Sequence, residues 1–328
     1  MHCNENLSVC LPTAVLDREP LITADGDKTV VSPSAVYMGG IGTFYIDLNT
    51  YNAEFVDRSH ASILEATPTQ EVVQNIILGD VSVLPLFTSI EKPVTKENLR
   101  IRVHSPISLD VTDGSGKRTG TTEVPGSDFK YVEESIPNSS YMEFGEGKYI
   151  FLDGDGEYII DLHGLATGTF TLGIDTIVDD VVVGTVEYEN IPVTEYTVGS
   201  LVVHGTASTS PLVLDVDGDG TSDSILSVGE VGPLEYIELI EEVVGQMDIA
   251  KNKEKKIEKR LDDIEDAIEK KEECTKKCDI PKLVKNIADE IDDFLNTIRK
   301  LNKKGHISHE DAQILVQMIE NLRLLVIQ

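Results

Sequence analysis

The chain has few basic residues and no long apolar run. Only 28 lysines and arginines stand against 58 aspartates and glutamates in 328 residues, so the formal net charge is −30. This charge repels phosphate backbones and anionic lipid headgroups, so we expect neither nucleic-acid binding nor attraction to a membrane surface. No apolar run reaches the length of a membrane span, and the N-terminal MHCNENLSVCLPTAVL lacks the cationic start and apolar core of a signal peptide.

Cysteine is scarce as well, with four residues in two close pairs, Cys3/Cys10 and Cys274/Cys278. Neither pair is accompanied by a second pair and histidines at the spacing of a zinc site, so zinc is not expected. Cys274 and Cys278 lie one helical turn apart, and this spacing is compatible both with a disulfide and with two free thiols.

The length and the 40% hydrophobic composition indicate folded protein with room for two or three domains. The residue pattern changes several times along the chain, which predicts a multidomain protein. We expect the end of an α/β sheet over 1–83, a linker over 84–98, an antiparallel β-sandwich over 99–208, an Asp-rich joint over 209–232 and an α-helical tail over 233–328.

The first region mixes strand and helix signals. GTFYIDL (42–48) is typical of a buried strand, and TQEVVQNIIL (69–78) has apolar residues at helical spacing. The region from 99 to 205 instead repeats short alternating runs such as LRIRVH, KYIFL, EYIIDL and SLVVHG, with turn-rich pieces between them. This pattern predicts an antiparallel sandwich, with DGDG (153–156) as a hairpin turn.

The last region has apolar residues at helical spacing. They are Ile257, Leu261, Ile264 and Ile268, then Val284, Ile287, Ile291, Phe294, Ile298 and Leu301, then Leu315, Ile319, Leu322 and Val326. Pro281 begins the second helix, and Ser308-x-x-Asp311 caps the third. We therefore expect a three-helix bundle or a coiled-coil hairpin with a packed third helix, and self-association through 257–268 and 284–301 is a further possibility.

One acidic loop has the spacing of a calcium site. In DVDGDGTSD (215–223) carboxylates recur at Asp215, Asp217 and Asp219, with a glycine at the sixth position for a sharp turn. Calcium takes several hard oxygen ligands, so the seventh position, Thr221, would offer its backbone carbonyl and Asp223 a further carboxylate. Closely spaced aspartates repel one another unless a cation compensates them, which favours a structural Ca²⁺.

The loop departs from the full EF-hand pattern because its twelfth position is Leu226 instead of glutamate. It more closely resembles the shortened DxDxDG loops that brace extracellular bacterial proteins. The resemblance implies an extracellular or cell-surface location and a stiffening role at the joint between sandwich and helices. The alternative interpretation is an acidic Asp-Gly turn without a metal.

Two segments near the N-terminus have a further resemblance. ADGDKTVVSPSA (24–35) contains GD-x-TV-x-x-x-SA, and DRSHASILE (57–65) follows it across a predicted strand. This order resembles the C-terminal end of α/β-hydrolases of the lecithin–cholesterol acyltransferase type and their bacterial lipase relatives. The resemblance implies that Asp27 is the triad acid, with Asp25 as the fallback, and that His60 is the triad base.

The serine nucleophile of that family is missing, because no G-x-S-x-G occurs in the chain. A histidine base without a serine to deprotonate supports no acyl transfer. We therefore expect the C-terminal portion of a lipase- or acyltransferase-like serine hydrolase, which acts on a lipid or ester substrate only in the complete protein and is inactive as this chain alone. The alternative is a non-enzymatic, calcium-braced extracellular β-sandwich module with a helical interaction tail.

Overall fold

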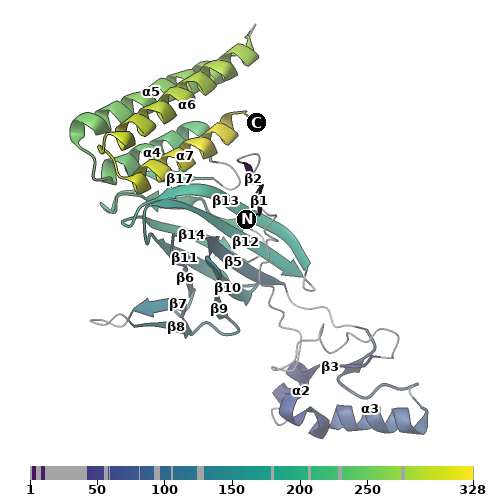
Figure 1. Ribbon diagram of the computed structural model, residues 1–328. Helices are drawn as coiled ribbons and strands as arrows, with labels where there is room; N and C mark the ends of the chain where they lie inside the picture. The colour runs from purple at the N-terminus through teal and green to yellow at the C-terminus, as the bar shows by residue number, and fades with distance from the viewer. Residues whose placement is uncertain are drawn as a thin grey trace. The chain divides into compact units, whose positions relative to one another are not determined.

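The computed structural model divides the chain into two compact units, Met1–Thr95 and Lys96–Gln328 (Figure 1). The residues that the structure describes are 2–4, 9–11, 43–54, 58, 60–80, 82–91, 97–104, 106–123, 129–178, 181–205, 208–227, 231–274 and 278–327.

The first unit contains short elements. Strand β1 pairs antiparallel with β2, which places Cys3 opposite Cys10, and β3 pairs antiparallel with β4. All strand pairs described in this unit are antiparallel, so the predicted end of an α/β sheet is not confirmed and stays a prediction. The elements are β1 (His2–Asn4), β2 (Val9–Leu11), β3 (Tyr45–Ile46), α2 (Leu48–Glu54), η1 (His60–Glu65), α3 (Thr67–Leu78) and β4 (Thr88–Ser89).

The predicted helix over 69–78 is confirmed as α3, which ends where Gly79 adopts φ 71°. The prediction of a buried strand over 42–48 was wrong in extent, because only Tyr45 and Ile46 form a strand and both are half-buried. Asp47 starts a helix instead: its carboxylate accepts the Thr50 N–H at 2.9 Å and the Thr50 hydroxyl at 2.6 Å. This is the arrangement of a helix N-cap. The predicted linker over 84–98 also contains strand β4, which pairs with β3.

In the described residues of the second unit, two antiparallel sheets precede the helices. One has the strand order β13-β12-β5-β10-β9, and the other β17-β16-β14-β11-β6-β7-β8, with β15 beside β14. Alternate residues of both sheets point inward, so that Ile101 on β5 and Ile160 on β11 lie in one hydrophobic core. The antiparallel sheets predicted from the short alternating runs are thus confirmed. The strands are β5 (Asn98–His104), β6 (Asp110–Asp113), β7 (Arg118–Glu123), β8 (Lys130–Glu134), β9 (Ser140–Phe144), β10 (Gly147–Asp153), β11 (Glu157–His163), β12 (Gly168–Val178), β13 (Val181–Val193), β14 (Val198–His204), β15 (Ser208–Thr209), β16 (Leu212–Asp215) and β17 (Ser224–Leu226).

Two connections differ from the predictions. DGDG (153–156) does not close a hairpin, because β10 and β11 on either side of it belong to different sheets. A turn signal indicates that the chain reverses but not which strand the next one pairs with, and here it carries the chain across the sandwich. The sheet also continues through the predicted joint 209–232, because β16 and β17 extend the larger sheet by two strands.

A buried ionic network crosses the five-stranded sheet. The Asp175 carboxylate accepts hydrogen bonds from Arg100 Nε at 2.9 Å and from Arg102 Nε at 3.2 Å. The Thr185 hydroxyl donates to the same carboxylate at 2.7 Å, and Arg102 also pairs with Glu187 at 2.8 Å. Asp175 is 1% exposed and Arg100 is 4% exposed. The two guanidinium groups therefore neutralise a carboxylate that water does not reach.

The described part of the helical tail contains four helices and not the three that we predicted. They are α4 (Pro233–Gln246), α5 (Lys251–Glu272), α6 (Ile280–Lys303) and α7 (His309–Ile327). Helix α4 was missed because its buried residues come in adjacent pairs, such as Tyr236/Ile237 and Val243/Val244, which widen the apolar face beyond one stripe. This width suits its position, since α4 contacts β13 of the sandwich as well as α5 and α7 (Figure 1).

The three predicted helices are confirmed, with their apolar residues directed into the core that the tail shares with the sandwich. Ser308 caps α7 as predicted, since its Oγ accepts the Asp311 N–H at 2.9 Å. A disulfide joins Cys274 to Cys278 between α5 and α6, which settles the choice that the spacing left open. The apolar stripes 257–268 and 284–301 pack within the chain, and helix-mediated self-association stays a prediction.

Acidic residues meet where α4 packs against α5. Glu238 and Glu241 on α4 lie near Glu258, Asp262 and Glu265 on α5. Burial, followed by the repulsion of these carboxylates, raises the pKa of Glu241 to about 7. This contact therefore favours a protonated Glu241.

We expect Asp175→Ala to lower the free energy of unfolding by about 3 kcal/mol, because it removes the carboxylate from the buried guanidinium of Arg100 and from the half-buried one of Arg102. Urea denaturation followed by circular dichroism measures the loss. Asp292→Ala is the control: Asp292 pairs with Arg323 at the surface, and such pairs contribute about 1 kcal/mol or less. Equal losses in the two variants would contradict the prediction.

We expect Glu241→Gln to stabilise the protein at pH 8 by about 1 kcal/mol, after allowance for solvent screening, and to have little effect near pH 4.5. The folded pKa of Glu241 is raised from 4.5 to about 7, so the folded state holds a proton that the unfolded state has lost. The wild-type free energy of unfolding should therefore fall as the pH rises through this window. Urea denaturation at both pH values measures it, and Glu189→Gln, the same substitution at an exposed residue of β13, is the control.

Candidate metal site in the β16–β17 hairpin

The Asp-rich segment is the loop of a β-hairpin at the edge of the larger sheet. Strands β16 and β17 pair with Leu212 opposite Leu226 and Leu214 opposite Ser224. Val216, between two aspartates of the motif, is fully buried, and its carbonyl accepts the hydroxyls of Thr194 at 2.6 Å and Thr197 at 3.1 Å. The core thus anchors the base of the loop.

The loop is folded by its own carboxylates. Asp215 accepts the N–H of Gly218 at 2.7 Å and of Gly220 at 2.8 Å, one on each carboxylate oxygen. Asp217 accepts the N–H of Asp219 at 2.9 Å. Gly218 and Gly220 have φ of 74° and 88°, in the left-handed region that glycine reaches without strain. Gly220 therefore makes the sharp turn that the sequence predicted, and Gly218 makes a second one.

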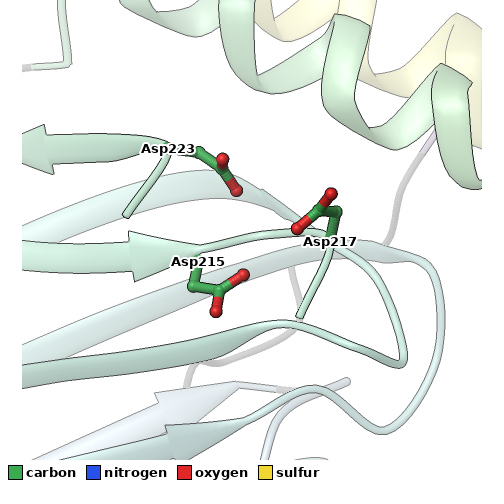
Figure 2. Close-up of side chains that lie close together, drawn as sticks. All are labelled: Asp215, Asp217 and Asp223. Atoms are coloured by element: carbon green, nitrogen blue, oxygen red, sulfur yellow. The ribbon is translucent and has the colours of Figure 1, made fainter. Parts of the chain in front are cut away.

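Three of the four aspartates converge. Carboxylate oxygens of Asp215, Asp217 and Asp223 lie within 4.8 Å of one another, and Figure 2 shows the three groups around one common space. Asp223 also accepts the Val216 N–H at 2.6 Å, which ties the end of the loop to its beginning. A set of carboxylate oxygens is the ligand chemistry of Ca²⁺ or Mg²⁺ and not of softer metals.

The fourth predicted aspartate, Asp219, lies outside this group. Asp219 is exposed, and its carboxylate accepts the Thr221 N–H at 2.7 Å, so it shapes the tip of the loop. Thr221 is exposed as well. The structure therefore brings together Asp215, Asp217 and Asp223 from the predicted set and leaves Asp219 at the tip, while the Thr221 carbonyl stays a predicted ligand.

A further carboxylate approaches from α4. Glu242 is half-buried, and burial, then the negative charges of Asp223, Asp217 and Asp219, raises its pKa. None of the ion pairs formed by the described residues includes one of the three converging aspartates. Sequence reasoning missed Glu242, because its proximity to the loop comes from the packing of α4 against the sandwich.

The structure does not describe the side chains of the predicted catalytic residues. Asp27 and Asp25 lie outside the described residues, and of His60 only the backbone is described, at the start of η1. The acid–base pair implied by the hydrolase resemblance therefore stays a prediction.

Comparison with known proteins adds no identification: no protein-family model, curated protein or solved structure matches this chain. In the described part of the chain, none of the helices combines the length and the apolar character that crossing a membrane requires.

We expect Gly218→Ala to destabilise the metal-free protein more than Gly220→Ala. Both substitutions place a side chain in left-handed backbone, which costs about 1 kcal/mol. At Gly218 the added Cβ would in addition lie 2.9 Å from the Tyr196 carbonyl oxygen, whereas nothing lies within 4 Å at Gly220. Urea denaturation in a chelator measures both, and a larger loss for Gly220→Ala would show that the loop is folded differently.

Proposed function

We propose that this chain is a non-enzymatic binding or structural module: an antiparallel β-sandwich braced by one Ca²⁺ in the β16–β17 hairpin, with a helical tail packed against it. The observation that carries the proposal is the convergence of Asp215, Asp217 and Asp223 on one space. Calcium tolerates irregular sets of oxygen ligands that water completes, which suits an open loop with three carboxylates better than the strict octahedron of Mg²⁺.

The proposed role of the ion is to hold the hairpin and α4 together. Without a cation, the loop carboxylates and Glu242 repel one another across the contact between sandwich and tail. A bound Ca²⁺ would reverse the sign of this interaction, since it would attract Glu242 as well as the three aspartates. Calcium should therefore stabilise the docking of α4 more than the remote parts of the sandwich.

The proposal includes an extracellular or cell-surface location. With three carboxylates the site should be weak, with a dissociation constant on the order of 10⁻⁴ to 10⁻³ M, as in extracellular calcium modules. Such a site fills only where calcium is millimolar. The Cys274–Cys278 disulfide supports the same location, because disulfides persist in oxidising compartments.

We expect calorimetry to detect one Ca²⁺ per chain, and Asp217→Asn or Asp223→Asn to weaken its binding by about tenfold or more. Asp219→Asn is the matched control on the same loop, since it removes the same charge from a residue outside the converging group. Its effect should be only a fewfold loss through the longer-range field.

Two outcomes would contradict this proposal. Absence of binding at millimolar calcium would leave the loop an acidic turn without a metal. Equal losses for Asp219→Asn and Asp217→Asn would show that general negative charge, and not the three converging carboxylates, attracts the ion. A melting-temperature increase with calcium that the Asp217→Asn variant lacks would support the bracing role.

A further inference from the structure

A groove of about 610 Å³ lies where the outer strands of the two sheets meet, β8 of the larger sheet and β9 of the smaller one. Both sheets line it, through β7 and β8 on one side and β9 and β10 on the other. Its volume is within the range of pockets that bind small molecules. The groove is separate from the Asp-rich hairpin, which lies at the opposite edge of the larger sheet.

The strand register places charged residues on the inner side of the sandwich here. Tyr141 on β9 lies opposite the core residue Ile150 on β10, and Glu143 lies opposite Lys148. Residues two apart on a strand share a face, so Tyr141, Glu143 and Lys148 face the same side as the core. At this end of the sandwich the inward-facing positions therefore change from apolar to charged, with Lys148 half-buried and Glu143 exposed.

Lys148 is the unusual member of this set. Its side chain is half-buried, and burial lowers its pKa, with Lys130 acting in the same direction and Glu143 opposing. Within the described residues no ion pair is formed by Lys148, and the Glu143 carboxylate is already engaged by the Tyr141 hydroxyl at 2.7 Å. A half-buried ammonium without an ion-pair partner is costly, and an anionic group of a ligand would compensate it.

The remaining lining suits a ring that carries hydroxyl groups. Tyr141 lines the groove, where its side chain packs against the core and its hydroxyl is held by Glu143, and Leu165 is 49% exposed at the groove. Ser108 and Thr121 contribute hydroxyl groups. A sugar ring can pack its C–H face on an aromatic ring while its hydroxyls bond to such side chains.

We propose that this groove binds a short saccharide that carries a single carboxylate, with the carboxylate at Lys148 and a ring face on Tyr141. A single carboxylate is specified because the chain's net charge of −30 repels polyanions. The proposal rests on the proposed role of the sandwich as a binding module but not on its calcium.

The experiment is calorimetric titration of the full chain with two acidic saccharides, a xylobiose that bears one glucuronate and a sialyl-lactose, against neutral xylotriose and lactose. We expect millimolar or tighter binding of at least one acidic saccharide and binding weaker by about tenfold or more for its neutral counterpart. Lys148→Met should reduce acidic-saccharide binding to the neutral level, and Lys148→Arg should retain most of it. Lys117→Met, in the exposed turn at the far end of β7, should bind as the wild type does.

Failure of this proposal is distinguishable from failure of the calcium proposal. Saccharide binding should persist in a chelator and in Asp217→Asn, while Lys148→Met should keep its calcium response and a wild-type circular dichroism spectrum. Absence of binding by both acidic saccharides overturns the proposal, as does equal binding of a carboxylate peptide such as Gly-Gly-Glu.

Discussion

The contact of α4 with the sandwich is the interaction on which the arrangement of the second unit depends. Tyr236 is 1% exposed at this contact, and its hydroxyl donates to the Asn190 carbonyl on β13 at 2.9 Å and accepts from Asn321 on α7 at 3.4 Å. Its ring and the apolar pairs beside it join the sandwich core to the helical core. A buried hydroxyl is costly when it forms no hydrogen bond. These two bonds therefore fix the orientation in which α4 packs against the sandwich.

The same contact concentrates negative charge. With its apolar face committed to the core, α4 carries Glu242 to the Asp-rich hairpin and Glu241 to the acidic side of α5. The burial of the apolar face of α4 outweighs the repulsion between these carboxylates. Protonation of Glu241 partly relieves the repulsion at α5, and in our proposal a cation relieves it at the hairpin. The contacts of α4 with the hairpin and with α5 should therefore respond both to pH and to calcium. Their stability should depend on ionic conditions more strongly than the stability of the sandwich core does.

Local signals predicted much of this fold. The 3.6-residue spacing of Ile257, Leu261 and Ile264 was sufficient for α5, and the Ser308 cap marked the start of α7. The same reasoning failed at α4, because its apolar face is wide and adjacent apolar pairs obscure the helical period. Turn residues at 153–156 indicated a reversal of the chain, but strand partners are chosen by long-range pairing, so the crossing between sheets was not predictable.

For the candidate sites, the sequence by itself determined the donor chemistry: aspartates at alternate positions and a glycine at the turn, because ligand type and local backbone conformation are properties of neighbouring residues. Only the tertiary structure decided that Asp223 joins Asp215 and Asp217 while Asp219 stays at the tip, and that Glu242 approaches from another element. It also decided that Lys148 faces the inside of the sandwich, because strand register is set by pairing between β9 and β10 and not by either strand alone.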